Sequence, residues 1–497
     1  MRVCRTVGLA AGLWGGVLAG SVVFAASAAA AETLGDAVAL AYESNPNLQA
    51  QRATQRALDE TYVQAQAGYR PTASVQGTLT NDANSLQNNP LMPTIGNLTG
   101  TPGGYNSSMG ALTVTQPLYT GGQVANQLNA AEAAVLAGRE NLRQVEETVL
   151  QNVVSAYVGV RRDQESLAIA QDDVNVLHGE LAETRARYQV GEITRTDVAE
   201  TEAQVAQAEA QLSSAQSQLA VDRSLYAAVV GQNPGALAPE PPLDKLLPNS
   251  LDQAFDLAQR NNPQLRQASY TEQSSAAKVA QVKAQTRPTA ALRGTLGYTG
   301  GNLGKGTPFA NYSRDVTALA VVNIPIFTGG LTSSQIRQAA ETNNADRITI
   351  EITRRQVVFN VAQAWNQLLG ARAALKSNEA QVRAANIAFE GSREEARVGL
   401  RTTLDVLITE QNLSNAELAL VTARHDEYVA AAALLVAMGA LYVQDLAGPT
   451  AIYDPKANFD KVRRSYPWTP WDRLVGAIDK TGAPSIAPPP PPAPIGR

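Results

Sequence analysis

A long internal duplication constrains the fold of this chain more than any other feature. Residues 33–41, followed by Asn45-Pro46, recur as residues 250–258, followed by Asn262-Pro263, at an offset of 217 residues. After an Arg-Pro pair in each half the offset becomes 208, as in the Thr-Gly-Gly sequences at 120–122 and 328–330. Proline and glycine that stay in phase over such a distance indicate two copies of one structural unit.

Both copies predict the same order of elements. A first helix (34–66 and 251–283) ends at Arg-Pro, and two strand candidates follow with a polar loop between them. A helical stretch of 67 residues comes next (123–189 and 331–397), and it would span roughly 100 Å. Val-Gly ends this stretch, and a helix of about 35 residues returns (196–230 and 404–438). The two shorter helices of a copy, stacked end to end, would match the long helix, as a long cylinder requires.

The returning helices have a seven-residue repeat of large apolar side chains, with alanines between them. In the first copy these are Val198, Val205, Leu212, Leu219 and Tyr226. This repeat is typical of helices that pack knobs into holes. By itself it fits a structural periplasmic coiled-coil or adaptor-type protein as well as it fits a helical duct, so both alternatives stay open at this point.

The strand candidates favour the duct. Val75 and Leu79 alternate with polar residues, and Leu292 and Leu296 repeat the pattern in the second copy. One apolar and one polar face over about ten residues is typical of a strand that separates lipid from a water-filled lumen. Aromatic residues, among them Tyr69, are expected to form belts at the ends of such strands. Four strands per chain cannot close a barrel, because the smallest membrane barrels have about eight, so several copies must share one.

Composition excludes other classes of function. Two arginines, an apolar run and an Ala-x-Ala site predict a secretory signal peptide over 1–31, and the only cysteine, Cys4, lies within it. The net charge of −5 and the lack of a basic stripe argue against a nucleic-acid partner. His178 and His425 have no second ligand at helical spacing, and no catalytic motif occurs. We therefore expect no enzyme activity, no cofactor and no metal site.

The duplication, the Arg-Pro and Thr-Gly-Gly junctions and the Val-Gly turns together resemble the TolC family of outer-membrane efflux proteins, over about residues 32–440. The resemblance implies a mainly α-helical homotrimer. It would have an α-helical barrel in the periplasm and a shared twelve-strand β-barrel, four strands per chain, in the outer membrane of a Gram-negative bacterium. The implied function is the exit duct of a tripartite efflux pump or type I secretion system. Its partners would be outer-membrane lipid, a periplasmic adaptor (membrane fusion) protein and an inner-membrane ABC or proton-driven transporter.

The resemblance also implies a pore gate at the periplasmic tip. The acidic residue that narrows the pore matches Asp405, the constraining arginine matches Arg401, and its neighbours on the other turn match Thr196 and Asp197. The tip turns that would contact the adaptor are Val190, Gly191, Val398, Gly399 and Leu400. Both aspartates also stand where an acid caps a helix, and the two roles can coexist.

Two further gate positions depart from the family pattern. The second acidic position falls on Ile408, and the aromatic partner of the aspartate falls on Ala396. A looser latch is therefore expected, and Arg195, Arg397 or Glu395 could substitute.

These observations divide the chain into five parts. They are the signal peptide 1–31, a first repeat 32–231 with its hairpin at about 71–117, an equatorial linker 232–249, a second repeat 250–439 with its hairpin at about 288–325, and an equatorial segment with a Pro-rich tail, 440–497.

Overall fold

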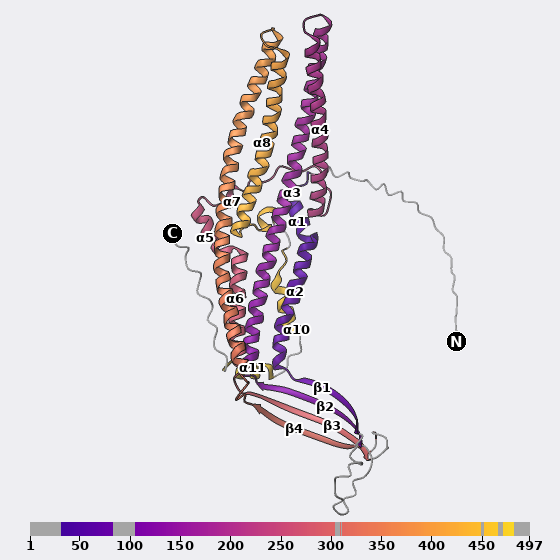
Figure 1. Cartoon of the computed structure of the whole chain (residues 1–497), viewed down its shortest axis with the longest axis vertical. Helices are drawn as coiled ribbons and strands as arrows, with labels where there is room; N and C mark the ends of the chain where they lie inside the picture. Colours follow the sequence, from indigo (N-terminus) through magenta and orange to yellow (C-terminus); the bar gives the residue numbers. More distant parts are fainter. Residues whose placement is uncertain are drawn as a thin grey trace, which may run out of the picture.

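The computed structural model describes residues 31–82, 105–303, 309, 311–448, 452–465 and 471–481. The expected signal peptide up to residue 30, most of the loop between the first two strands and the Pro-rich tail lie outside these residues. Figure 1 shows a long, slender body with two helical hairpins at one end and a single sheet at the other. The elements in chain order are α1 (Leu34–Ser44), α2 (Pro46–Gln66), η1 (Ala67–Tyr69), β1 (Thr72–Asp82), β2 (Tyr105–Tyr119), α3 (Gln123–Gln189), α4 (Arg195–Val230), η3 (Asp244–Leu246), α5 (Leu251–Asn261), α6 (Pro263–Ala284), β3 (Thr289–Leu303), β4 (Ser313–Asn323), α7 (Leu331–Arg397), α8 (Thr403–Met438), α9 (Val443–Ala447), α10 (Pro455–Ser465) and α11 (Trp471–Thr481).

The long helices α3 and α7 have the predicted bounds, but the first helix of each repeat is broken. Asn45 separates α1 from α2 because its backbone is extended (φ −61°, ψ 122°). Its side-chain oxygen accepts hydrogen bonds from the amides of the new helix, and Pro46 occupies the first position, where no amide donor is needed. Asn262 and Pro263 make the same break between α5 and α6. None of the helices in the described parts of the chain is long and apolar enough to cross a membrane.

The four strands form one antiparallel sheet in the order β1-β2-β3-β4. Its register gathers side chains of one kind into rows that run across all four strands. One such row is apolar and consists of Val75, Leu112, Leu296 and Val316. The neighbouring row lies on the opposite face and consists of Ser74, Thr113, Thr295 and Thr317. The strands β1 and β3 therefore have the apolar and the polar face that their alternation predicted, whereas β2 and β4 also place Met109, Leu319 and Val321 on the polar face.

The main core lies midway along the helices, where α1, α3 and α8 meet. Tyr157 and Tyr226 are fully buried there, with Leu434. The Tyr157 hydroxyl shares its proton between the backbone carbonyls of Ala238 (2.6 Å) and Glu32 (2.9 Å), which ties the chain start and the 232–249 linker to the middle of α3.

The C-terminal helices extend along the body toward the sheet. The rings of Phe459 in α10 and Tyr62 in α2 meet edge to face, 5.2 Å apart. Helix α11 lies at the junction of helices and sheet (Figure 1). It is held there because Val475 packs against Tyr69 and Val124, which are buried. Tyr69 is therefore a core residue at this junction, not part of an aromatic belt.

Candidate pore gate at the hairpin tips

The two hairpin tips, α3–α4 and α7–α8, are built in the same way. Each long helix ends in a valine that is followed by a glycine with positive φ, +81° at Gly191 and +78° at Gly399. A left-handed glycine reverses the chain at low steric cost, which explains the Val-Gly pair in both repeats. The amide of Gly191 donates to the Tyr188 carbonyl (3.0 Å), and that of Gly399 donates to the Ala396 carbonyl (3.0 Å). Val190, Val398 and Leu400 are at least 70 % exposed, so both tips present large apolar side chains, with Glu192 at the position of the first tip that matches Leu400.

Asp197 and Asp405 each complete a capping box at the start of the returning helix. The Asp405 carboxylate accepts hydrogen bonds from the amide (3.1 Å) and the hydroxyl (2.8 Å) of Thr402. The Asp197 carboxylate accepts the equivalent bonds from Thr194, at 2.7 and 2.8 Å. These bonds lower the pKa of both carboxyl groups, so both are ionised at neutral pH. Both aspartates therefore cap the helices that they begin.

Arg401 does not reach the other tip within one chain. Its guanidinium bonds the Glu395 carboxylate on its own hairpin, with Nε 2.8 Å from Oε2. Both side chains are about half exposed. Glu395 is one of the residues that could substitute for the aromatic partner replaced by Ala396. It holds Arg401 beside Asp405. The two residues expected to face Arg401, Thr196 and Asp197, lie at the α3–α4 tip and belong to a separate turn.

The two hairpins contact each other below their tips. Leu407 of α8 packs into a small core with Val205 and residues of α3. Gln204 of α4 donates a hydrogen bond to Gln411 of α8. Arg393 of α7 forms an ion pair with Glu180 of α3, with 3.4 Å between Nε and Oε1. One apolar cluster and two polar contacts thus connect the repeats near the candidate gate.

Two buried carboxyl groups with a strongly raised pKa are not evident from the sequence. Glu410 lies just below the tip contacts and is 5 % exposed, and burial raises its pKa to about 8. Glu147 lies in the middle of α3 and is 3 % exposed, and burial raises its pKa to about 8 as well, against the opposing effect of Arg143. The sequence marks neither of them as buried, because Glu147 matches Arg355 in the second repeat and Glu410 matches Glu202 in the first.

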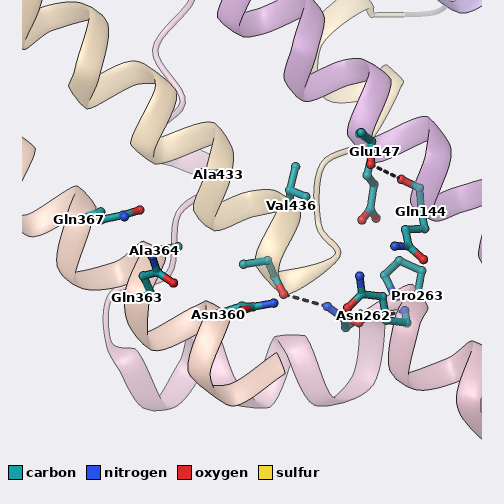
Figure 2. Close-up of a pocket in the computed structure, with 13 residues that line it drawn as sticks. Gln144, Glu147, Asn262, Pro263, Asn360, Gln363, Ala364, Gln367, Ala433 and Val436 are labelled. Carbon is teal, nitrogen blue, oxygen red and sulfur yellow. Dashed lines mark hydrogen bonds between the residues drawn. The ribbon is translucent and has the colours of Figure 1, made fainter. Parts of the chain in front are cut away.

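The helical body also has a cavity of about 290 Å³, bordered by α3, α6, α7 and α8. Figure 2 shows Gln144 and Glu147 of α3 beside Asn262 and Pro263, where α6 begins. Most of its polar lining is carboxamide, and Glu147 is its one titratable residue. The lining therefore holds no acid–base pair. Among the residues described by the structure, no three His, Cys, Asp or Glu side chains come close enough together to hold a metal ion.

A long helical body with capped tips and a sheet with one apolar face at the far end defines a channel-forming class of envelope protein. The outer membrane efflux protein family model matches this chain over residues 37–231 and 254–440. The outer membrane efflux protein BepC of Brucella suis is 33 % identical over 452 residues, which covers 90 % of this chain and 94 % of BepC. The alkaline protease secretion protein AprF of Pseudomonas aeruginosa is 27 % identical over 348 residues, covering 69 % of this chain and 72 % of AprF.

A solved structure shows the same fold. The outer membrane protein VceC of Vibrio cholerae superposes with a TM-score of 0.67 at 21 % identity, covering 82 % of this chain and 96 % of that one. The chain therefore belongs to the outer membrane efflux protein family. It is an outer-membrane exit duct for efflux or secretion, with its helical part in the periplasm. A purely structural coiled-coil protein, the alternative from the sequence, does not fit this family.

Proposed function

We propose that the chain works as a homotrimer, a passive duct without enzyme activity, in which three four-stranded sheets close one twelve-strand barrel. One observation carries the proposal: the sheet ends in two edge strands, β1 and β4, that pair with only one neighbour each within the chain. An unpaired edge with an exposed apolar face is unstable unless another strand covers it. Helix α7 supports the same conclusion, because large apolar side chains stay exposed along it: Ile348, Ile352, Phe359, Leu369 and Ile387.

The duct would connect an inner-membrane transporter to the exterior through a periplasmic adaptor. The tip turns at Val190-Gly191 and Val398-Gly399-Leu400 are the surface that we propose for the adaptor, since both expose a valine beside a glycine with positive φ. The relatives' names point to two kinds of cargo, efflux substrates for BepC and a secreted protease for AprF. Either an ABC or a proton-driven transporter would suit such a duct.

We propose Asp405 and Arg401 as the gate, with Thr196 and Asp197 on the facing turn. Three copies of Asp405 around a narrow neck would concentrate cations, because like charges in a confined aqueous space attract counterions. Each Arg401 holds Glu395 within one chain, and contact with the facing turn of a neighbouring copy would compete with that pair. Exposed pairs contribute only about 0.2–1 kcal/mol each, so the latch is weak and easily opened.

Recordings of the purified protein in planar bilayers test this function. Asp405→Asn keeps an oxygen for the cap but removes the charge, and it should reduce cation selectivity and block by multivalent cations. Arg401→Ser should raise single-channel conductance. The matched control is Asp36→Asn, which changes an equivalent capping box with Thr33 at the start of α1, far from the tips. Mass measurement in detergent should give three chains. A protein that stays a monomer or forms no channel would refute the duct, and unchanged selectivity in Asp405→Asn would refute the gate.

A further inference from the structure

The duplication places the same arginine–glutamate pair in both hairpins. Arg185 and Glu202 in the first repeat correspond to Arg393 and Glu410 in the second at the offset of 208 residues. In the first repeat the pair is formed within the α3–α4 hairpin, with 2.7 Å between the Arg185 Nη2 and Glu202 Oε1 atoms. Both side chains are about half exposed. The expected arrangement of the second repeat is therefore an Arg393–Glu410 pair between α7 and α8.

The second repeat does not form this pair. Arg393 reaches across to Glu180 of α3 instead, 3.4 Å from its carboxylate. Glu410 remains 5 % exposed, and neither of its carboxylate oxygens has a hydrogen-bond partner. An ionised carboxylate left unpaired in such a place is expensive, so the arrangement requires either a proton on Glu410 or a different partner.

The acidic side chains around Glu410 favour its protonated form. Asp172 and Asp173 face it from α3, and Glu180 adds a third negative charge. On α8 itself Glu417 lies near the same two aspartates. The nearby positive charges lie on α7. Arg393 lowers the pKa of Glu410, and Arg393 and Arg397 both lower the pKa of Glu180. From α4 comes the neutral Gln204, which bonds Gln411. The second repeat has no acid at the positions that match Asp172, Asp173 and Glu180. These positions, 380, 381 and 388 of α7, are Ala, Gln and Ala.

We propose that Arg393 is a two-position switch between the hairpins. It bonds Glu180 while the α7–α8 hairpin rests against α3, and it transfers to Glu410 when that hairpin moves away. The second position reproduces the arrangement that Arg185 already has in the first repeat. The ion pair lost between the hairpins is thus replaced by one within a hairpin, which makes separation of the two repeats reversible near the tip.

The switch responds to protons with a definite sign. With the hairpins in contact, burial and then the charge of Asp173 raise the pKa of Glu410 to about 8 from an ordinary value of 4.5. After separation, water and Arg393 would return it toward that ordinary value. The contact state therefore binds the proton more tightly. The stabilisation that this proton gives the contact state is complete below pH 4.5 and is lost as the pH rises through about 8. In between, the equilibrium should shift by up to about tenfold per pH unit in each chain.

Two variants test the switch. Glu410→Gln mimics the protonated side chain at nearly equal volume, so the hairpins should stay in contact and most of the response between pH 5 and 8 should disappear. Glu180→Gln removes the partner in the contact state, so Arg393 should pair with Glu410 and the hairpins should separate already at neutral pH. The matched control is Glu202→Gln in the first repeat, which should leave the pH response of the wild type unchanged.

The main readout is the distance between spin labels on cysteines introduced at the exposed positions Ala182 of α3 and Asn386 of α7. It should lengthen with rising pH in the wild type and not in Glu410→Gln. Equal pH responses of the two proteins, or a Glu180→Gln variant as closed as the wild type, would overturn the switch. Channel conductance should follow the same order. Only this conductance rests on the proposed duct, so a protein that conducts nothing yet shows the distance change would refute the duct and retain the switch.

Discussion

The two junctions between helices and sheet have the same sequence pattern but different surroundings. In the first repeat, Asp479 of α11 is fully buried and caps the start of α3. Its carboxylate accepts bonds from the amides of Thr120 (2.8 Å), Gly122 (3.0 Å) and Ala125 (3.3 Å). In the second repeat, Ile326 and Phe327 beside the start of α7 are 94 % and 88 % exposed.

The long helices repeat this contrast. Tyr157 is fully buried in α3, whereas α7 exposes a row of large apolar side chains. Repeats with the same order of elements thus have unequal surroundings: α3 is buried in the core of the chain, and α7 leaves large apolar side chains exposed. A substitution at a feature that both repeats share should therefore have a similar effect in either repeat. A substitution at a contact that only one repeat makes should affect stability in that repeat alone.

The largest effect is expected from lysine on the apolar face of the sheet. Val75 and its counterpart Leu292 lie on this face, in β1 and β3. Val75→Lys or Leu292→Lys should each destabilise the assembled protein by about 2–4 kcal/mol at the bilayer midplane. The strands are equivalent in the two repeats, so the two costs should be similar. Heat-dependent migration of the trimer in gels measures them, and Thr295→Lys on the polar face is the control. A larger cost for Thr295→Lys would mean that the two faces are reversed.

Asp479→Ala should have the next largest effect. It leaves several amides at the start of α3 without an acceptor and removes the partner of the Tyr69 hydroxyl (3.1 Å). A loss of about 2–3 kcal/mol is expected, because each unpaired buried donor costs about 1–3 kcal/mol. Thermal unfolding followed by circular dichroism gives the measurement. Thr328→Ala, at the uncapped start of α7, should change little. If both variants unfold alike, α11 does not stabilise the first junction.

Glu147 should make the first repeat sensitive to alkali. Its pKa is raised to about 8 in the folded protein from 4.5, so its proton stabilises the fold below pH 4.5 and this contribution is lost as the pH rises through 8. The slope is at most about 1.4 kcal/mol per pH unit. Glu147→Gln should therefore flatten the dependence of the melting temperature on pH between 5 and 8. The counterpart Arg355 is 81 % exposed, and Arg355→Gln should leave the profile as it is.

The smallest effect is expected from the tip caps, where the repeats are alike. Thr194 and Thr402 make the same bonds to Asp197 and Asp405. Replacing either threonine by alanine should cost about 1 kcal/mol locally, the typical value for an N-cap. Hydrogen exchange of the first turns of α4 and α8 should increase equally in the two variants. An effect confined to one tip would show that the tips are not equivalent in the assembled protein.

The sequence by itself determined the elements that depend on local geometry. Glycine and proline restrict the backbone at each junction, so the bounds of α3 and α7, the tip turns and the capping boxes followed from the residues there. The alternation in β1 and β3 likewise predicted the two faces of the sheet, because its period is set by the strand. The one local error, an unbroken first helix, came from disregarding the Asn-Pro pair that stops α1 and begins α2.

Only the tertiary structure decided which carboxylates are buried and which partner each one has. Asp479 caps α3 from more than 350 positions away in the chain, and Arg393 pairs with Glu180 although the repeat offers it Glu410. Neither contact follows from propensity or periodicity, because both depend on which helix faces meet after packing. The same reason explains why two repeats of one layout have different surroundings: the burial and the charge of a residue depend on its neighbours in space, and many of these neighbours differ between the repeats.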